Sequence, residues 1–259
     1  MPYPLDRHFV AEELGFEAIS ANSMDAVADR DFLLDFHAAA AICMMHLSRL
    51  GEELVLWSSQ EFAFITLAEQ YTTGSSIMPQ KRNPDFAEIG RGKTGRVYGN
   101  LMALLTTLKG LPLTYNRDLQ EDKEGFFDTV DTLLSTLQVF AGMVETMTVN
   151  YSRMEEAAQT GNMMATDLAD YLVARGMPFR EAHGVLRCAS RYAREHGREV
   201  HQLTLEEYRR FSPLFEEDVL NITLEGSVGS RDVPGGTAPQ QVNAALREAK
   251  RLLENADEY

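Results

Sequence analysis

Apolar residues recur with a spacing of three and four in three long stretches of the chain. The stretches cover residues 32–57, 86–108 and 126–151. Alternating steps of three and four match the 3.6-residue period of an α-helix that buries one face along its whole length. The pattern therefore predicts three long helices that pack together as a bundle.

Four glycines within the middle stretch are unusual for the interior of a helix. Each glycine destabilises an isolated helix by about 1 kcal/mol relative to alanine. We therefore expect the backbone of this helix to approach a neighbouring helix or a substrate closely. The four residues are Gly90, Gly92, Gly95 and Gly99.

After about residue 155 the pattern changes to shorter helices with frequent stop signals. Thr166 is expected to cap a helix that ends at Gly176, because threonine is a good N-cap and glycine a good helix terminator. Pro178 is expected to open the next helix and Gly197 to close it.

Two further segments, 204–207 and 237–240, have the form of a capping box, so a last helix should begin near Pro239. Alternation typical of strands is scarce throughout. The predicted fold is all-α. It consists of a long-helix bundle over residues 1–154 and a small helical domain over residues 155–259.

The formal net charge of −15 argues against binding to nucleic acid or to an anionic membrane through a general basic field. An anionic ligand therefore needs a local group of cations. The densest such group in the chain is Lys81, Arg82, Arg91, Lys93 and Arg96.

The two cysteines, Cys43 and Cys188, lie far apart and have no neighbouring ligands at the spacing of a metal site. No apolar run approaches the roughly 18 residues of a membrane span, and the start of the chain lacks the apolar core of a signal peptide. We expect a cytoplasmic protein that uses no metal ion or cofactor.

Residues 74–84, with the sequence GSSIMPQKRNP, have the composition of a reactive loop. Its first glycine allows movement, and Pro79 prevents a helix from running through the middle. Asn83 and Pro84 are typical of an N-cap followed by the first residue of a helix. A serine of the loop could then exchange a proton while Lys81 and Asn83 face developing negative charge.

This loop resembles the signature of the fumarase and argininosuccinate lyase superfamily, whose members eliminate fumarate from a substituted succinate. The segment 108–124, LKGLPLTYNRDLQEDKE, narrows the resemblance to the argininosuccinate lyases. The resemblance extends over essentially the whole chain. Further matching segments are 5–7, 22–32, 213–219 and 234–239.

The resemblance implies reversible cleavage of argininosuccinate to arginine and fumarate, the last step of arginine biosynthesis. Ser75 matches the proton-transfer residue, and Lys81 and Asn83 match the groups that bind the carboxylate into which the carbanion's charge spreads. Glu88 falls where the family orients its partner histidine. The implied substrate-binding residues are Arg30, Tyr115, Gln120 and Lys123.

The histidines depart from the family pattern, because none has the His-x-Gln context of the family's catalytic histidine. Family members are much longer at the N-terminus, so the chain resembles their C-terminal portion. The expected partners are further copies in a homotetramer, or a chain that supplies the N-terminal half, and the isolated chain is expected to be inactive. The histidines are His8, His37, His46, His183, His196 and His201.

Two alternatives remain. Another fumarate-releasing enzyme such as adenylosuccinate lyase, aspartase or fumarase shares the loop, but the segment 115–124 argues against it. A non-catalytic assembly protein, like the lens crystallins related to this enzyme, would use only the bundle. The joint presence of Ser75, Lys81 and Asn83 disfavours that second alternative.

Overall fold

The computed structural model describes residues 3–160 and 163–256. The chain forms two compact units, residues 1–150 and 151–259. These two units meet after residue 150, whereas the sequence predicted a domain boundary after residue 154. The domain boundary itself remains a prediction. Each unit is described below by itself.

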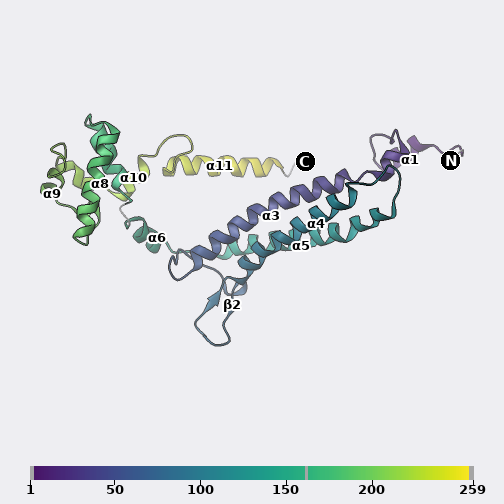
Figure 1. Ribbon diagram of the computed structural model, residues 1–259, viewed down its shortest axis with the longest axis horizontal. Coiled ribbons are helices and arrows are strands. Elements are labelled where there is room, and N and C mark those ends of the chain that lie inside the picture. The colour runs from purple at the N-terminus through teal and green to yellow at the C-terminus, as the bar shows by residue number, and fades with distance from the viewer. Residues whose placement is uncertain (1–2, 161–162, 257–259) are drawn as a thin grey trace. The chain divides into compact units, whose positions relative to one another are not determined.

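Three long helices form the first unit: α3 (Asp31–Ser58), α4 (Asp85–Leu108) and α5 (Asp122–Thr146). They run side by side, as Figure 1 shows. This arrangement confirms the predicted all-α fold with a long-helix bundle. The other elements of the unit are α1 (Arg7–Glu13), α2 (Ser23–Ala28), β1 (Ile65–Thr66), η1 (Glu69–Tyr71), β2 (Thr73–Gly74), β3 (Arg82–Asn83), η2 (Arg117–Glu121) and β4 (Thr148–Val149).

The buried face of α3 differs from the predicted one at its start. Leu33 is buried, whereas Phe32, the first apolar residue of the predicted stretch 32–57, is 63% exposed. A count of apolar residues alone missed that His37 is fully buried and occupies a core position one turn after Leu33. Further along, Met44 and Leu54 lie in the core as members of two apolar clusters.

The third long helix is shorter than its apolar pattern predicted. Helix α5 ends at Thr146, and Met147 already has an extended backbone. Strand β4 follows and pairs antiparallel with β1, so that Val149 lies opposite Ile65. Tyr151 then begins a separate helix and is exposed, so it does not continue the buried face.

The glycines of α4 have unequal surroundings. A Cβ atom added at Gly90 would collide with the ring of Phe140, so the predicted close approach of a neighbouring helix is right at this position. No atom of the described residues lies within 4 Å of a Cβ added at Gly92, Gly95 or Gly99, so no helix of this chain approaches them closely, and the predicted approach of a substrate stays a prediction there.

The second unit has its own apolar core, which includes Leu172, Tyr208 and Phe215. Gly176 and Gly197 follow α7 and α8 with φ angles of +92° and +67°, a conformation that favours glycine. Its elements are α6 (Tyr151–Ala158), α7 (Ala165–Ala174), α8 (Phe179–Glu195), η3 (Val200–Gln202), α9 (Leu205–Arg209), η4 (Glu217–Asn221), α10 (Leu224–Gly229) and α11 (Pro239–Ala256).

The predicted helix starts in this unit were mostly right. Pro178 is the cap residue of α8, the last helix begins at Pro239, and the capping box of Thr204 and Glu207 forms. Thr166 is an exception, because α7 begins one residue before it and leaves it inside the first turn.

Candidate active site

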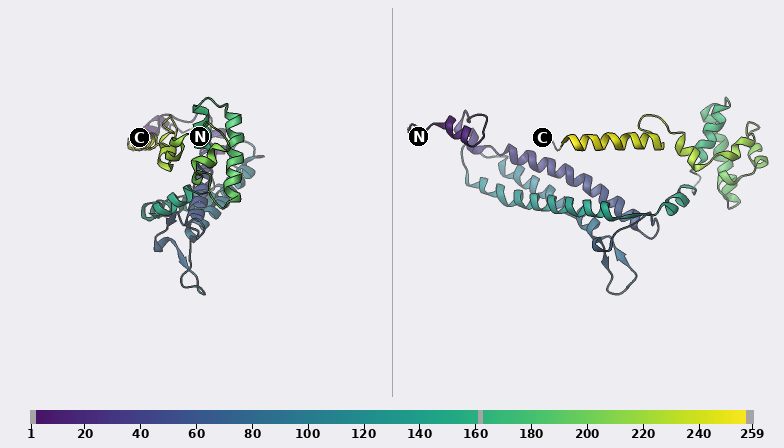
Figure 2. Two further views of the ribbon diagram at one scale, coloured as in Figure 1. Left: turned by 90° about the vertical axis from the view of Figure 1, so that its left-hand side faces the viewer. Right: turned by 180° about the vertical axis from the view of Figure 1, so that it is seen from behind.

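The signature loop is the tip of a β-hairpin that projects from the bundle just before α4 (Figures 1 and 2). Strands β2 and β3 pair antiparallel, with Thr73 opposite Asn83. The Thr73 hydroxyl donates to the Asp85 carboxylate at the start of α4, and Arg82 forms an ion pair with Glu69. These contacts fix the base of the hairpin, while its tip is largely exposed.

Asn83 does not have the helix-capping role predicted for it. It belongs to β3, and Pro84 occupies the cap position before α4, whose first residue is Asp85. Strand pairing with Thr73 holds Asn83 one residue too far from the helix to cap it. Within the described residues its side-chain amide makes no hydrogen bond, so it can serve a ligand.

Ser75 is half-buried, and its hydroxyl oxygen is a hydrogen-bond acceptor. The backbone N–H groups of Ile77 and Met78 donate to this oxygen at 3.3 and 3.2 Å. The N–H of Ser75 itself donates to the carbonyl of Lys81 at 3.3 Å. Because donors aimed at an oxygen stabilise its ionised form, the two loop amides favour an alkoxide on Ser75.

Lys81, Asn83 and Glu88 line one cleft of about 690 Å³. Ser58 at the end of α3 and the next residue, Ser59, also line this cleft. The Lys81 ammonium group has no partner among the described residues. A cation and an amide therefore face a space that can accept a carboxylate, with the Glu88 carboxylate beside them.

A second group of predicted site residues surrounds the start of α3 and of α5. Arg30 immediately precedes α3, and its Nε donates to Oδ2 of Asp122 at 2.5 Å. Nζ of Lys123 donates to Oδ1 of the same carboxylate at 2.8 Å. The structure thus brings the two predicted cations Arg30 and Lys123 to one carboxylate.

Tyr115 and Gln120 lie in the turn and in the short helix η2 that lead into this group, and both are exposed. Thr114 has a φ angle of +76°, which is strained for a β-branched residue. Its N–H donates to the carbonyl of Met24 at 3.2 Å and so ties the turn to α2. Such strain costs about 1–3 kcal/mol and is concentrated at ligand sites.

Within one chain the two groups are far apart. Asn83 and Glu88 lie at the start of α4, whereas Tyr115 and Gln120 follow its end. A helix of 24 residues is about 36 Å long. No small substrate spans that distance, so a site that uses both groups must combine two chains.

Sequence reasoning missed the contact of Asp122 with the two predicted site cations, Arg30 and Lys123. The run 121–124, EDKE, shows a carboxylate next to Lys123, which is a local signal. The contact with Arg30 joins residues 92 positions apart, and no local pattern indicates it.

His37 is the one fully buried histidine among the described residues. Its ring packs edge-on against Phe36 and Phe126, and neither ring nitrogen has a hydrogen-bond partner. Burial lowers the pKa of His37, so the imidazole is neutral at pH 7. No histidine lines the cleft of Lys81 and Asn83.

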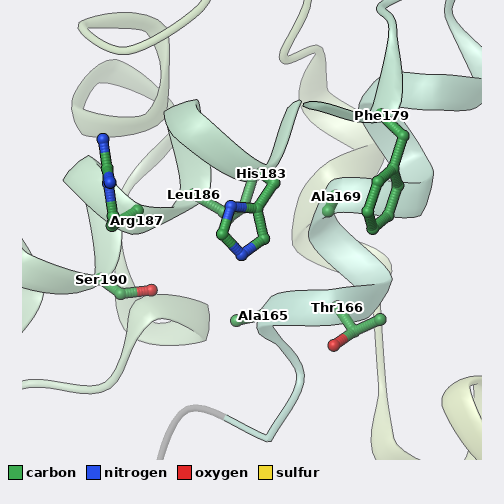
Figure 3. A pocket seen from close by; sticks show the side chains of 8 residues that line it. All are labelled: Ala165, Thr166, Ala169, Phe179, His183, Leu186, Arg187 and Ser190. Atoms are coloured by element: carbon green, nitrogen blue, oxygen red, sulfur yellow. The ribbon is translucent and has the colours of Figure 1, made fainter. Parts of the chain in front are cut away.

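A separate cavity of about 270 Å³ lies between α7 and α8 of the second unit (Figure 3). The ring of His183 extends into it, and the hydroxyl groups of Thr166 and Ser190 lie on either side. None of the predicted site residues lines this cavity. It is therefore distinct from the candidate active site.

The described part of the chain holds no group of three or more His, Cys, Asp or Glu residues arranged to bind a metal ion. In the same part of the chain, no helix combines the length and the apolar character that a membrane span requires.

Two family profiles match the chain. One, described as "Lyase", covers residues 2–99, and one described as "Argininosuccinate lyase C-terminal" covers residues 162–229. The crystal structure of EDDS lyase in complex with formate has the same fold, with a TM-score of 0.85 and 28% identity over 98% of this chain and 53% of that one. The fold and the hairpin define a lyase of the fumarase and aspartase superfamily.

Curated relatives indicate a particular family within this superfamily. Argininosuccinate lyase of Dehalococcoides mccartyi is 56% identical over 256 residues, which are 99% of this chain and 56% of the relative. The enzyme of the same name from Thioalkalivibrio sulfidiphilus is 57% identical over 97% of this chain and 54% of the relative. The chain belongs to the argininosuccinate lyase family. It spans about half the length of the curated relatives it matches.

Proposed function

We propose that this chain forms part of an argininosuccinate lyase, which splits argininosuccinate reversibly into arginine and fumarate as the last step of arginine biosynthesis. The proposal is supported by relatives of that name at 56–58% identity. The observation that carries it is the pair of loop amides that donate to the Ser75 hydroxyl oxygen. The free thiols of Cys43 and Cys188 fit a reducing compartment such as the cytoplasm.

In the proposed reaction, Ser75 removes a proton from the carbon beside a carboxylate of the succinate moiety. The electron pair of the broken C–H bond spreads into that carboxylate, where the Lys81 ammonium and the Asn83 amide stabilise the added charge. The C–N bond then breaks, its electron pair leaves with the guanidinium nitrogen, and the carbon skeleton becomes fumarate.

The departing nitrogen needs a proton from an acid. No histidine lines the cleft that contains Lys81 and Asn83, and His37 is buried in the bundle. We infer that a segment outside residues 1–259 supplies the acid. Activity of this chain then requires association with such a segment.

Arg30, Tyr115, Gln120 and Lys123 are proposed to bind the substrate at a site whose hairpin comes from another copy. Their separation from the hairpin by the length of α4 supports this arrangement. Large apolar side chains exposed along the bundle support association into a homotetramer or with an N-terminal half. They include Ile42, Ile89, Met102, Phe127 and Leu134.

Substitution of Ser75 tests the proposal. In an assembly of this chain with the first half of a curated relative, Ser75→Ala should lower turnover at saturating argininosuccinate by about 10²- to 10⁴-fold, because the proton-transfer group is lost. Fumarate release is followed by its ultraviolet absorbance. Ser76→Ala is the matched control, since Ser76 is exposed and makes no side-chain hydrogen bond among the described residues. Near-normal turnover of the Ser75 variant would remove this residue from the mechanism.

A further inference from the structure

We propose that Asp122 is a positioning residue of the lyase, whose carboxylate fixes Arg30 and Lys123 so that together they bind one carboxylate of the substrate. The inference rests on the proposed function. It is carried by the burial of Asp122, by its two ion pairs and by the hydrogen bonds that restrain Arg30.

The guanidinium group of Arg30 is restrained on two of its three nitrogens. Nε donates to Asp122, while Nη1 donates to the carbonyls of Asp29 at 2.6 Å and Val27 at 3.3 Å. Nη2 has no partner among the described residues. Arg30 is only 15% exposed, so its one free nitrogen is held in a fixed place from which it can donate to a ligand.

Asp122 uses both of its carboxylate oxygens for these cations. It is 5% exposed, whereas Lys123 is 64% exposed and can reach a ligand while it stays bonded to Asp122. Burial alone raises the pKa of Asp122, but hydrogen bonds from Lys123 and Arg30, together with their positive charges, outweigh burial and lower it. The carboxylate is therefore ionised at neutral pH.

The charges of this cluster indicate the chemical class of its ligand. Arg30, Lys123 and the buried Asp122 carboxylate leave a net charge of +1 among these three groups, and the carboxylate also screens the two cations from each other. Glu121, Glu124 and Asp128 line the same cavity as Asp122. One free guanidinium nitrogen beside one exposed ammonium group suits a single carboxylate, because each ligand oxygen then receives a charged donor. The substrate offers such a carboxylate in two places, on its arginine moiety and on its succinate moiety.

A purely structural role for Asp122 is the competing explanation, since its ion pair with Arg30 joins the starts of α3 and α5. Asp128 provides a matched control on the same helix. Its carboxylate accepts from Nε of Arg96 at 2.7 Å and from the Asn100 amide at 2.8 Å, so it joins α5 to α4 in a similar way. In the described part of the chain, the hydrogen bonds and the ion pair of Asp128 involve Arg96 and Asn100 and none of the predicted site residues.

The test is steady-state kinetics of the assembled enzyme. Asp122→Asn should raise KM for argininosuccinate on the order of tenfold, because the charged hydrogen bonds that hold Arg30 and Lys123 in place are weakened, and should leave kcat nearly unchanged because Ser75 is intact. Asp128→Asn should leave KM within about twofold. Asp122→Glu keeps the charge and should give an intermediate KM. If the asparagine variant fails to fold, the KM of the glutamate variant is measured in its place.

A second readout uses the chain by itself. In the nuclear magnetic resonance spectrum of arginine side chains, the Nε–H signal of Arg30 should be protected from exchange and should lose protection in Asp122→Asn but not in Asp128→Asn. An unchanged KM in Asp122→Asn, or an equal rise in Asp128→Asn, would overturn the positioning role. Unaltered protection of the Arg30 signal would overturn its geometric basis. Absence of fumarate release from the unsubstituted assembly would instead overturn the proposed function, and with it the substrate role of Asp122.

Discussion

At the scale of single residues, Gly90 and Gly92 show how two similar positions of one helix differ. Both lie inside α4, and both lower its intrinsic helix propensity. The ring of Phe140 on α5 lies against Gly90 and leaves no room for a Cβ atom there, while Gly92 faces open space. Only Gly90 is required for the packing of α4 against α5.

We therefore expect opposite effects of alanine at these two positions. Gly90→Ala should lower the free energy of unfolding by about 1–3 kcal/mol, because the new methyl group overpacks the contact with Phe140. Gly92→Ala should raise it by up to about 1 kcal/mol through helix propensity alone. Urea unfolding of the two variants, followed by helical circular dichroism, measures both changes. A shift of the same sign and size in both would contradict the packing described here.

The candidate site shows which features of single residues the sequence could predict. The resemblance of the loop to the family signature indicated Ser75, Lys81 and Asn83, and the roles that it implies for them stay predictions. It could not show that Ile77 and Met78 donate to Ser75, since these bonds depend on the hairpin. The contact of Asp122 with Arg30 could likewise not be predicted from the sequence, because it depends on how the starts of α3 and α5 pack together.

At the scale of elements, the capping box of α9 combines a local and a tertiary interaction. The N–H of Thr204 donates to the Glu207 carboxylate at 2.9 Å, as the sequence pattern predicted. Arg198 also donates to this carboxylate at 2.5 Å, which no capping pattern indicates. The hydrogen bond from Arg198, followed by that from Thr204, lowers the pKa of Glu207 from 4.5 to about 2.

The lowered pKa predicts how stability depends on pH. Because Glu207 binds its proton more weakly in the folded state, its stabilising contribution is complete above pH 4.5 and is lost as the pH falls to about 2. Glu207→Gln should therefore be less stable than the unsubstituted chain at pH 7, and the difference should disappear near pH 2. Glu206→Gln, at the exposed neighbouring position, is the matched control. The measurement is denaturant unfolding across this pH range, and a constant difference for Glu207→Gln would contradict the assignment.

Element boundaries followed the sequence where a local signal was strong. Gly176, Gly197 and Pro178 marked helix ends and starts correctly, because backbone conformation at these residues is set locally. The buried face of α3 was less predictable at its start. A histidine in the core changed which apolar residues lie inside, and only tertiary packing decides whether a histidine is buried.

At the scale of the whole molecule, the separation of the two groups of predicted site residues and the exposed apolar surface both favour association with further chains. Ser75 and Lys81 lie on the hairpin before α4, while Arg30 and Lys123 lie beyond its other end. A single chain therefore presents two incomplete parts of a site. On the proposed function, association completes the site, and it would also cover apolar side chains that the first unit leaves exposed.

The proposed function predicts that this chain acts as an argininosuccinate lyase only in such an assembly. The most direct measurement compares fumarate release by the chain of residues 1–259, by the part of the Dehalococcoides mccartyi relative that this chain does not cover, and by their mixture. We expect turnover in the mixture alone, and its loss when the chain carries Ser75→Ala. Strong turnover by the chain alone would contradict the account, as would the absence of fumarate release from a mixture in which sedimentation shows that the two parts have associated.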